Sequence, residues 1–198
     1  MSKKHRFFSA LATLGGAMGK GLISGFAGTL AITAAQMIEM QITKRDGSSS
    51  PLIVAGKALG VEARGKAEQA REEANSNDGN APEQTEQKVQ ENAAQFSQTM
   101  HFSYGTAWGM ARGFLDLLGI RGLWACVLHF IGIWATALVM LPSANASKPV
   151  TKWPPLQIVL DALFHAIYAA AAGGMYDAMK KAEKKDQKRA FFRRFRKW

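Results

Sequence analysis

The sequence predicts an all-α membrane protein built as a four-helix transmembrane bundle, and three observations support this fold class. The 198-residue chain has 47% hydrophobic residues, which are gathered in about four long stretches. Its net charge of +10 is concentrated at the two ends of the chain. A long polar insert brings the mean hydropathy to −0.09, so the average resembles that of a soluble protein while the pattern is typical of a membrane protein.

The composition and the motifs exclude several function classes. The single cysteine, Cys126, rules out an internal disulfide framework and a Cys-based zinc site. The sequence has no phosphate-binding loop, no nucleophile elbow and no His-Glu-x-x-His arrangement. We therefore expect a protein that is not an enzyme and that has no cofactor.

The chain begins with a basic flank, residues 1–20, which has four cationic residues and ends at Lys20. Residues 21–43 are predicted as the first transmembrane helix, because about 20 apolar residues in helical form cross the hydrocarbon core. A cleaved signal peptide is the alternative for this region. Lys20 argues against it, because this cation interrupts the apolar run.

A polar extracytoplasmic loop, residues 44–99, follows the first helix and has seven basic and nine acidic residues. Its centre, residues 72–95, has too few apolar residues to form a core, so we expect disorder or a frayed helix there. The segment Ser50–Leu59 is short and apolar, with Pro51 at the first helical position. It is predicted to lie on the membrane surface or to pack on the bundle.

Two apolar stretches come next and are separated by a tight connection. The second predicted helix, residues 100–120, contains Arg112 and Asp116, whereas the third, residues 122–141, has no formal charge. The uncharged stretch is therefore the clearest transmembrane helix in the sequence. Because the connection is short, it predicts that the charged stretch also crosses the membrane.

A loop over residues 142–155 leads to the fourth predicted helix, residues 156–179. Pro154 and Pro155 fit the start of a helix and not its interior. The cytoplasmic ends of membrane helices are enriched in Lys and Arg. The first flank contributes a charge of +4 and residues 180–198 contribute +8, so both termini are predicted to be cytoplasmic in an inner (plasma) membrane, which requires an even number of helices.

The basic tail, residues 180–198, places Phe191, Phe195 and Trp198 on one face of an amphipathic helix. An aromatic face surrounded by cations and preceded by a membrane helix favours anionic lipid headgroups over nucleic acid. The predicted lipid-binding residues are Lys180, Lys181, Lys184, Lys185, Lys188, Arg189, Phe191, Arg193, Arg194, Phe195, Arg196, Lys197 and Trp198.

A short pattern occurs twice and indicates an internal repeat. His, two residues, Tyr, a small residue, three residues and Gly follow one another from His101 and again from His165. The chain would then consist of two copies of a two-helix unit, and the alternative is a chance match over nine positions.

Small residues recur every four positions within these helices. Gly105, Gly109 and Gly113 form a strip on the second helix, and Gly173 belongs to a similar strip on the fourth. Such strips let helix backbones approach closely in lipid. We expect them to be packing seams, either within the chain or between copies of it.

Charged and titratable side chains at membrane depth are candidates for function. Arg112 and Asp116 are four residues apart and predict an intramembrane ion pair. A second group, which we call the outer polar cluster, is expected near the extracytoplasmic surface and could hold a divalent metal ion or relay protons. Its alternative is a set of interfacial residues that hydrogen-bond one another or lipid headgroups. The outer polar cluster consists of Glu39, His101, Asp161 and His165.

The repeat sharpens one hypothesis about this cluster. In an up-down bundle the second and fourth helices are diagonal, so His101 and His165 would face each other at equal depth. That arrangement suits bis-histidine ligation of haem. His129 on the third helix has no counterpart in this scheme.

The order of these features resembles a group of small, uncharacterised bacterial inner-membrane proteins with four predicted spans, and it is loosely similar to the YagU-like membrane proteins. The resemblance covers most of the chain except the polar insert and the tail, and it implies no activity. The residues that carry it are Gly25 to Thr29, Arg45 to Pro51, His101 to Gly109 with Arg112-Gly113, the helix from Trp134 to Leu141-Pro142, and Asp161 to Tyr168.

Two function hypotheses follow from the sequence. The first is a non-enzymatic membrane scaffold or partner protein that binds anionic lipid through its tail and associates with itself or with another membrane protein. The second is a small transporter, channel or haem- or metal-binding redox protein that uses the outer polar cluster.

Overall fold

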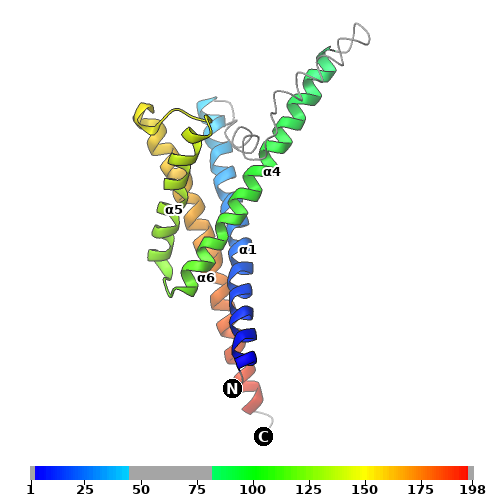
Figure 1. Cartoon of the computed structure of the whole chain (residues 1–198), viewed down its shortest axis with the longest axis vertical. Helices are drawn as coiled ribbons and strands as arrows, with labels where there is room; N and C mark the ends of the chain where they lie inside the picture. The colour runs from blue at the N-terminus through cyan, green and yellow to red at the C-terminus, as the bar shows by residue number, and fades with distance from the viewer. Residues whose placement is uncertain (1–2, 45–81, 196–198) are drawn as a thin grey trace.

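The described part of the chain contains helices joined by short connections and has no strands. The computed structural model describes residues 3–44 and 82–195, in which four α-helices and one 3-10 turn follow one another (Figure 1). The surface segment Ser50–Leu59 and the first part of the insert centre lie outside the described residues. The elements are α1 (Lys3–Thr43), α4 (Pro82–Leu117), α5 (Gly122–Ser143), η1 (Val150–Lys152) and α6 (Pro155–Phe195).

Most of these helices extend beyond the predicted transmembrane stretches. α1 and α6 have 41 residues each, which corresponds to about 60 Å at 1.5 Å per residue. The basic flank and the basic tail are therefore continuous with the first and last helices. α4 begins at Pro82, so the last part of the predicted loop is helical as well, since its Glu, Gln and Ala residues favour helix in the absence of a core.

Among the described residues, three helices are long and apolar enough to cross a membrane, judged by length and composition alone. They are α1, α5 and the part of α6 from Pro155 to Arg193. α4 does not reach this standard, because its first half is polar and its second half contains Arg112 and Asp116. The membrane character of the chain is thus supported, while the fourth span has to be argued from the position of α4.

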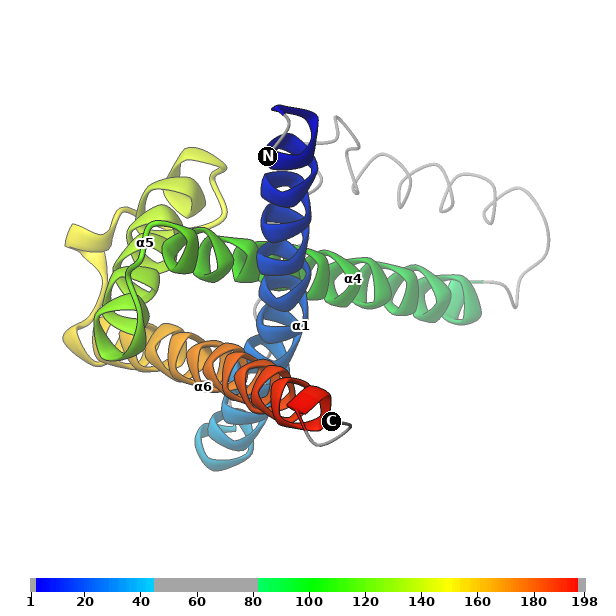
Figure 2. The same ribbon diagram turned by 90° about the horizontal axis from the view of Figure 1, so that it is seen from below.

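The helices cross one another instead of forming a parallel up-down bundle. α1 lies at the centre and packs on both α4 and α6, while α5 packs mainly on α6 (Figures 1 and 2). Figure 2 shows α4 crossing α1 at a steep angle, and in Figure 1 the first half of α4 extends away from the other helices. The beginning of α1 and the end of α6 lie at the same end of the molecule (Figure 1).

The contact between α1 and α4 is made through small residues. A Cβ atom on Gly21 of α1 would lie 2.6 Å from the Gly109 carbonyl oxygen of α4, and one on Gly25 would lie 2.5 Å from the Thr106 carbonyl oxygen. Gly105 lies against Thr29 in the same seam. Backbone contact this close leaves no room for a side chain, so glycine is required at these positions.

Two other glycines of the predicted strips also lie at helix contacts. Gly113 of α4 lies against Ala17 of α1, and Gly173 of α6 lies against the Cys126 side chain of α5. Gly109 and Gly173, which are equivalent in the proposed repeat, therefore each face the helix that precedes their own. Tyr104 and Tyr168 differ, because Tyr104 is exposed and Tyr168 is buried. The repeat stays a prediction.

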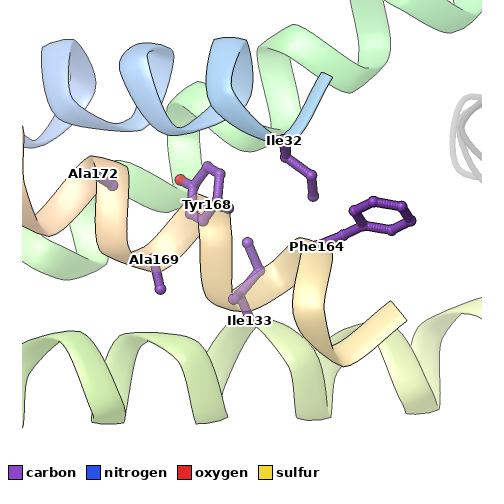
Figure 3. Close-up of a cluster of buried hydrophobic side chains, with 6 residues drawn as sticks. All are labelled: Ile32, Ile133, Phe164, Tyr168, Ala169 and Ala172. Atoms are coloured by element: carbon purple, nitrogen blue, oxygen red, sulfur yellow. The ribbon is translucent and has the colours of Figure 1, made fainter. Parts of the chain in front are cut away.

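The apolar core is small and lies where α1, α5 and α6 meet. Figure 3 shows Tyr168 of α6 pointing toward α1 and Ile32 of α1 pointing back toward α6. The Tyr168 hydroxyl donates to the Gly105 carbonyl oxygen of α4 over 2.5 Å, so this buried polar group is satisfied. Large apolar side chains such as Trp124 and Val139 face outward, as expected of surfaces that contact lipid.

Candidate functional site

Charged side chains from three helices and one turn gather at the end of the molecule that holds the α4–α5 turn. We call this group the charged layer. α4 ends at Leu117 and α5 begins at Gly122, and Gly119 and Gly122 adopt positive φ angles of 82° and 60° in the turn between them, which favours glycine at both positions. The charged layer consists of Lys20, Arg112, Asp116, Arg121, Asp177, Lys180 and Glu183.

Asp116 is the central acceptor of the charged layer. Its Oδ1 accepts a hydrogen bond from Arg121 Nε at 2.8 Å. Its Oδ2 lies 2.9 Å from Lys180 Nζ and accepts a hydrogen bond from the Tyr176 hydroxyl at 3.2 Å. Only 6% of the Asp116 side chain is exposed. One buried carboxylate therefore joins the end of α4, the following turn and α6.

Arg112 is completely buried and pairs with α6. Its Nη2 donates to Asp177 Oδ1 over 2.5 Å, and its guanidinium carbon lies 4.5 Å from the centre of the Tyr176 ring. A charge-assisted hydrogen bond and a cation–π contact together compensate for its removal from water. The sequence predicted Asp116 as the partner of Arg112, but Asp116 is taken up by Arg121 and Lys180, and Asp177 of α6 replaces it.

A further ion pair connects α1 to the charged layer. Lys20 Nζ lies 3.0 Å from Glu183 Oε2 of α6, and both side chains are partly exposed. An exposed pair of this kind contributes little to stability. It does fix which turn of α1 lies beside α6, so α1, α4, α6 and the α4–α5 turn are connected at this end.

Three buried polar atoms near the charged layer have no hydrogen-bond partner among the described residues. They are Nε and Nη1 of Arg112 and Nδ1 of His129. His129 lies on α5, and its Nε2 is 3.1 Å from the Trp108 carbonyl oxygen, which requires Nε2 to be the protonated nitrogen. Nδ1 of His129 is therefore an acceptor, and Arg112 supplies two unused donors. Sequence reasoning did not identify His129 as part of this region.

The members of the outer polar cluster make separate contacts. His165 Nδ1 lies 2.8 Å from the Asp161 carbonyl oxygen and 3.6 Å from Asp161 Oδ2. Trp134 of α5 donates to Asp161 Oδ2 over 2.9 Å. His101 Nε2 lies 3.3 Å from the Thr33 hydroxyl of α1.

Glu39 interacts on its own helix, where its Oε1 accepts from the Thr43 hydroxyl at 3.1 Å. Within residues 3–44 and 82–195, no three His, Cys, Asp or Glu side chains are grouped so that they could hold a metal ion. Asp161 and His165 come together, but neither Glu39 nor His101 joins them in such a group. His101 lies against Thr33 and His165 against Asp161, and the bis-histidine haem hypothesis stays a prediction.

The last part of α6 carries the predicted lipid-binding residues. All described side chains from Lys181 to Arg193 are exposed, and Phe191 and Phe192 contact each other with ring centres 5.9 Å apart. Lys180 differs from the rest of the tail because it is bound to Asp116. Residues 196–198 lie outside the described residues, as do the side chains of residues 194 and 195.

The sequence identified only some residues of the charged layer as functional candidates. Arg112, Asp116 and Lys180 were singled out as individual residues, but Asp177, Tyr176 and Arg121 were not assigned to a site. Their common depth could be deduced from the short turn between α4 and α5 and from the end of the apolar part of α6. Which side chains pair with one another depends on helix rotation, which a single sequence does not provide.

No family model, curated protein or solved structure matches this chain. The function is therefore inferred from the geometry of the described residues.

Proposed function

We propose that this protein is a non-enzymatic, multipass scaffold of the inner (plasma) membrane that has both termini in the cytoplasm and contacts anionic lipid through its basic ends. The observation that carries the proposal is the charged layer, because it lies at the end where both basic helix segments leave the bundle. Ion pairs at this level fix two long helices whose exposed ends extend further on the same side.

The position of α4 supports a fourth crossing of the membrane. α5 has no formal charge over its 22 residues, which correspond to about 33 Å, close to the thickness of the hydrocarbon core. The end of α4 is joined to the start of α5 by a short turn, and Gly105 and Gly109 pack deeply against α1. The second half of α4 therefore lies beside the uncharged α5. Its Arg112 and Asp116 are shielded from lipid by burial within the protein.

The two basic ends favour contact with an anionic leaflet. The first turns of α1 expose Phe7 and Phe8 beside Lys3 and Lys4, and the tail has a net charge of +8 over residues 180–198. Each basic residue near an anionic surface contributes about 1 kcal/mol. Aromatic residues in the same segments add apolar contacts with the interface.

An open strip of small residues on α6 supports association with a second membrane helix. Ala166, Ala170, Gly174 and Ala178 are spaced four residues apart. A Cβ atom on Gly174 would meet nothing within 4 Å, in contrast to the closely packed Gly109. A second copy of the chain or another membrane protein could therefore approach here as closely as α4 approaches α1.

The lipid proposal is tested with the full chain and a chain truncated after Lys181, both reconstituted in vesicles that contain spin-labelled phosphatidylglycerol or phosphatidylcholine. We expect both proteins to insert, and we expect the truncated chain to lose most of the preference for phosphatidylglycerol. An unchanged preference would contradict the role of the tail.

Reporter fusions at residue 80 and at the C-terminus test the proposed topology. A cytoplasmic location of residue 80 would overturn it.

A small transporter or channel is the second candidate function. The unpartnered buried atoms of Arg112 and His129 favour it, because buried polar groups without a protein partner are typical of sites that take up water or a polar ligand. Proton flux into vesicles that contain the wild-type protein would support this candidate. Flux equal to that of empty vesicles would reject it.

A further inference from the structure

Arg121 and Lys180 are held at the two oxygens of one carboxylate. Arg121 belongs to the α4–α5 turn and contacts Asp116 Oδ1, whereas Lys180 belongs to α6 and contacts Asp116 Oδ2, at 2.8 and 2.9 Å. The Tyr176 hydroxyl, which donates to Oδ2, fixes the carboxylate from the buried side. Two cations from distant parts of the sequence are thereby held at one carboxylate, and their combined charge with Asp116 is +1.

Both cations retain unused hydrogen-bond donors. Arg121 donates to Asp116 through Nε, and its two Nη groups make no hydrogen bond to any described residue. Lys180 has three donors and uses one of them for Asp116. The Arg121 side chain is 61% exposed and that of Lys180 is 29% exposed. Two Nη groups and an ammonium group, held at the two oxygens of one carboxylate, are the kind of donors that suit the oxygens of a phosphate group.

The residues that flank Arg121 in the sequence are apolar and exposed. Leu118 precedes Arg121 in the turn, and Leu123 and Trp124 follow it in the first turn of α5, and all three side chains are largely exposed. Arg121 itself immediately precedes the uncharged helix α5. The cation pair thus lies at the level where the proposed hydrocarbon region meets the headgroups, where tryptophan is enriched.

We propose that Arg121 and Lys180 form a binding site for the phosphate of an anionic phospholipid in the cytoplasmic leaflet, with Asp116 as the positioning residue that holds the two cations together. Leu118, Leu123 and Trp124 contact the acyl chains of the same lipid. These apolar side chains favour a lipid over free phosphate, which needs none of them. The inference depends on the proposed membrane placement, but the site is separate from the exposed part of the tail.

The test measures lipid retained by the full-length protein in detergent, by native mass spectrometry, during titration with phosphatidylglycerol, phosphatidylcholine or inorganic phosphate. We expect one phosphatidylglycerol molecule to be retained in preference to phosphatidylcholine. The double variant Arg121→Gln, Lys180→Gln should weaken this retention about tenfold or more, because it removes charge-assisted hydrogen bonds. The matched control, Lys185→Gln with Lys188→Gln, removes the same charge from the tail and should retain the lipid. Equal losses in the two double variants would overturn the site.

The variant Asp116→Asn separates a positioned site from general electrostatic attraction. It makes this region more positive, so attraction by net charge alone predicts tighter binding of phosphatidylglycerol. The proposed site predicts weaker retention, because the two cations lose the carboxylate that holds them together. Tighter retention would contradict the role of Asp116. If Asp116→Asn does not fold, the single variant Arg121→Gln still tests the proposal, since the Arg121 side chain is mostly exposed. Normal lipid retention in a folded Arg121→Gln protein would overturn the proposal.

Two further arms identify the source of the phosphate and separate this site from the tail. Inorganic phosphate should not displace the lipid at equal concentration, and displacement would overturn the assignment to a lipid. The chain truncated after Lys181 keeps Asp116, Arg121 and Lys180, so it should retain the lipid. Loss of the lipid in this truncated chain would show that the tail, and not Arg121 with Lys180, holds the lipid, and it would overturn the proposed site. If the tail does not contact lipid in vesicles, the proposed function of the tail fails, but the lipid should still be retained at Arg121 and Lys180.

Discussion

The two ends of the helix bundle differ in how their acidic residues interact. In the charged layer, beside the α4–α5 turn, each carboxylate interacts with a cation from another part of the fold. At the opposite end, His165 and Thr43 interact with acidic residues of their own helices. The hydrogen bond from Trp134 of α5 to Asp161 of α6 does join two helices there. The difference shows that polar residues at a common depth stabilise a helix bundle only when rotation brings them to the same interface.

The largest effect is expected from Asp177→Ala, which leaves the buried Arg112 guanidinium without its charged partner. Loss of one partner of a buried pair costs about 3–5 kcal/mol, and the partial exposure of Asp177 places the expected loss toward the lower value. Unfolding by SDS in mixed micelles measures it. The control Glu183→Ala breaks an exposed pair on the same helix and should cost less than about 1 kcal/mol. Similar losses of unfolding free energy in the two variants would contradict the expectation that the buried pair stabilises the protein more than the exposed pair.

Asp116→Ala should have the next largest effect on stability. It removes the acceptor for Arg121, Lys180 and Tyr176 at once, and Arg121 and Lys180 can turn to water or headgroups. We therefore expect a loss of about 2 kcal/mol in the free energy of unfolding. Protease cleavage within the α4–α5 turn should become faster in the same variant. A cleavage rate equal to that of the wild type would show that Asp116 does not hold this turn.

A smaller effect is expected from Trp134→Phe at the opposite end. The substitution keeps an aromatic ring but removes the donor to Asp161, which corresponds to a loss of about 1 kcal/mol in the same SDS unfolding measurement. Trp124→Phe is the matched control on α5, because Trp124 is exposed. Its unfolding free energy should not change, and equal effects of the two substitutions would argue against the Trp134–Asp161 hydrogen bond.

The smallest effect is expected from the combined substitution of His101 and His165 by Gln. Their contacts with Thr33 and Asp161 are single hydrogen bonds near helix ends, so the loss of stability should stay below about 1 kcal/mol. Metal content and visible absorbance of the purified protein should be the same before and after substitution. Loss of bound metal or of a haem absorbance band would instead support the second function hypothesis.

Local sequence patterns predicted much of the helix content and the glycine strips. The uncharged stretch that became α5 matches its predicted range closely, and Gly105 and Gly109 lie in the seam that their spacing indicates. These features depend on apolar length and on a repeat of four residues, which are properties of one helix. The sequence left disorder and a frayed helix open for residues 72–95, and α4 begins within this range at Pro82, because low hydrophobicity excludes a core but does not prevent a helix.

Pairings between helices were predicted less well for a physical reason. Arg112 and Asp116 are correctly spaced for an ion pair, yet α6 supplies Asp177 and Lys180 at the same depth. The outer polar cluster was expected from depth alone, whereas His101 lies against Thr33 of α1 and His165 against Asp161 of its own helix. Depth can be deduced from hydropathy, but the rotation of each helix about its axis comes from side-chain packing across the whole molecule.

The uninterrupted helix from Pro155 to Phe195 has a mechanical consequence. A straight helix of about 60 Å acts as a stiff rod, so a tilt or rotation imposed on its exposed last turns is transmitted along its length. Lys180 and Asp177 hold the middle of this rod to α4 and its turn, and they act as a pivot. Movement of the last turns of α6 in one direction would therefore displace the opposite arm, with Asp161 near its far end, in the other direction.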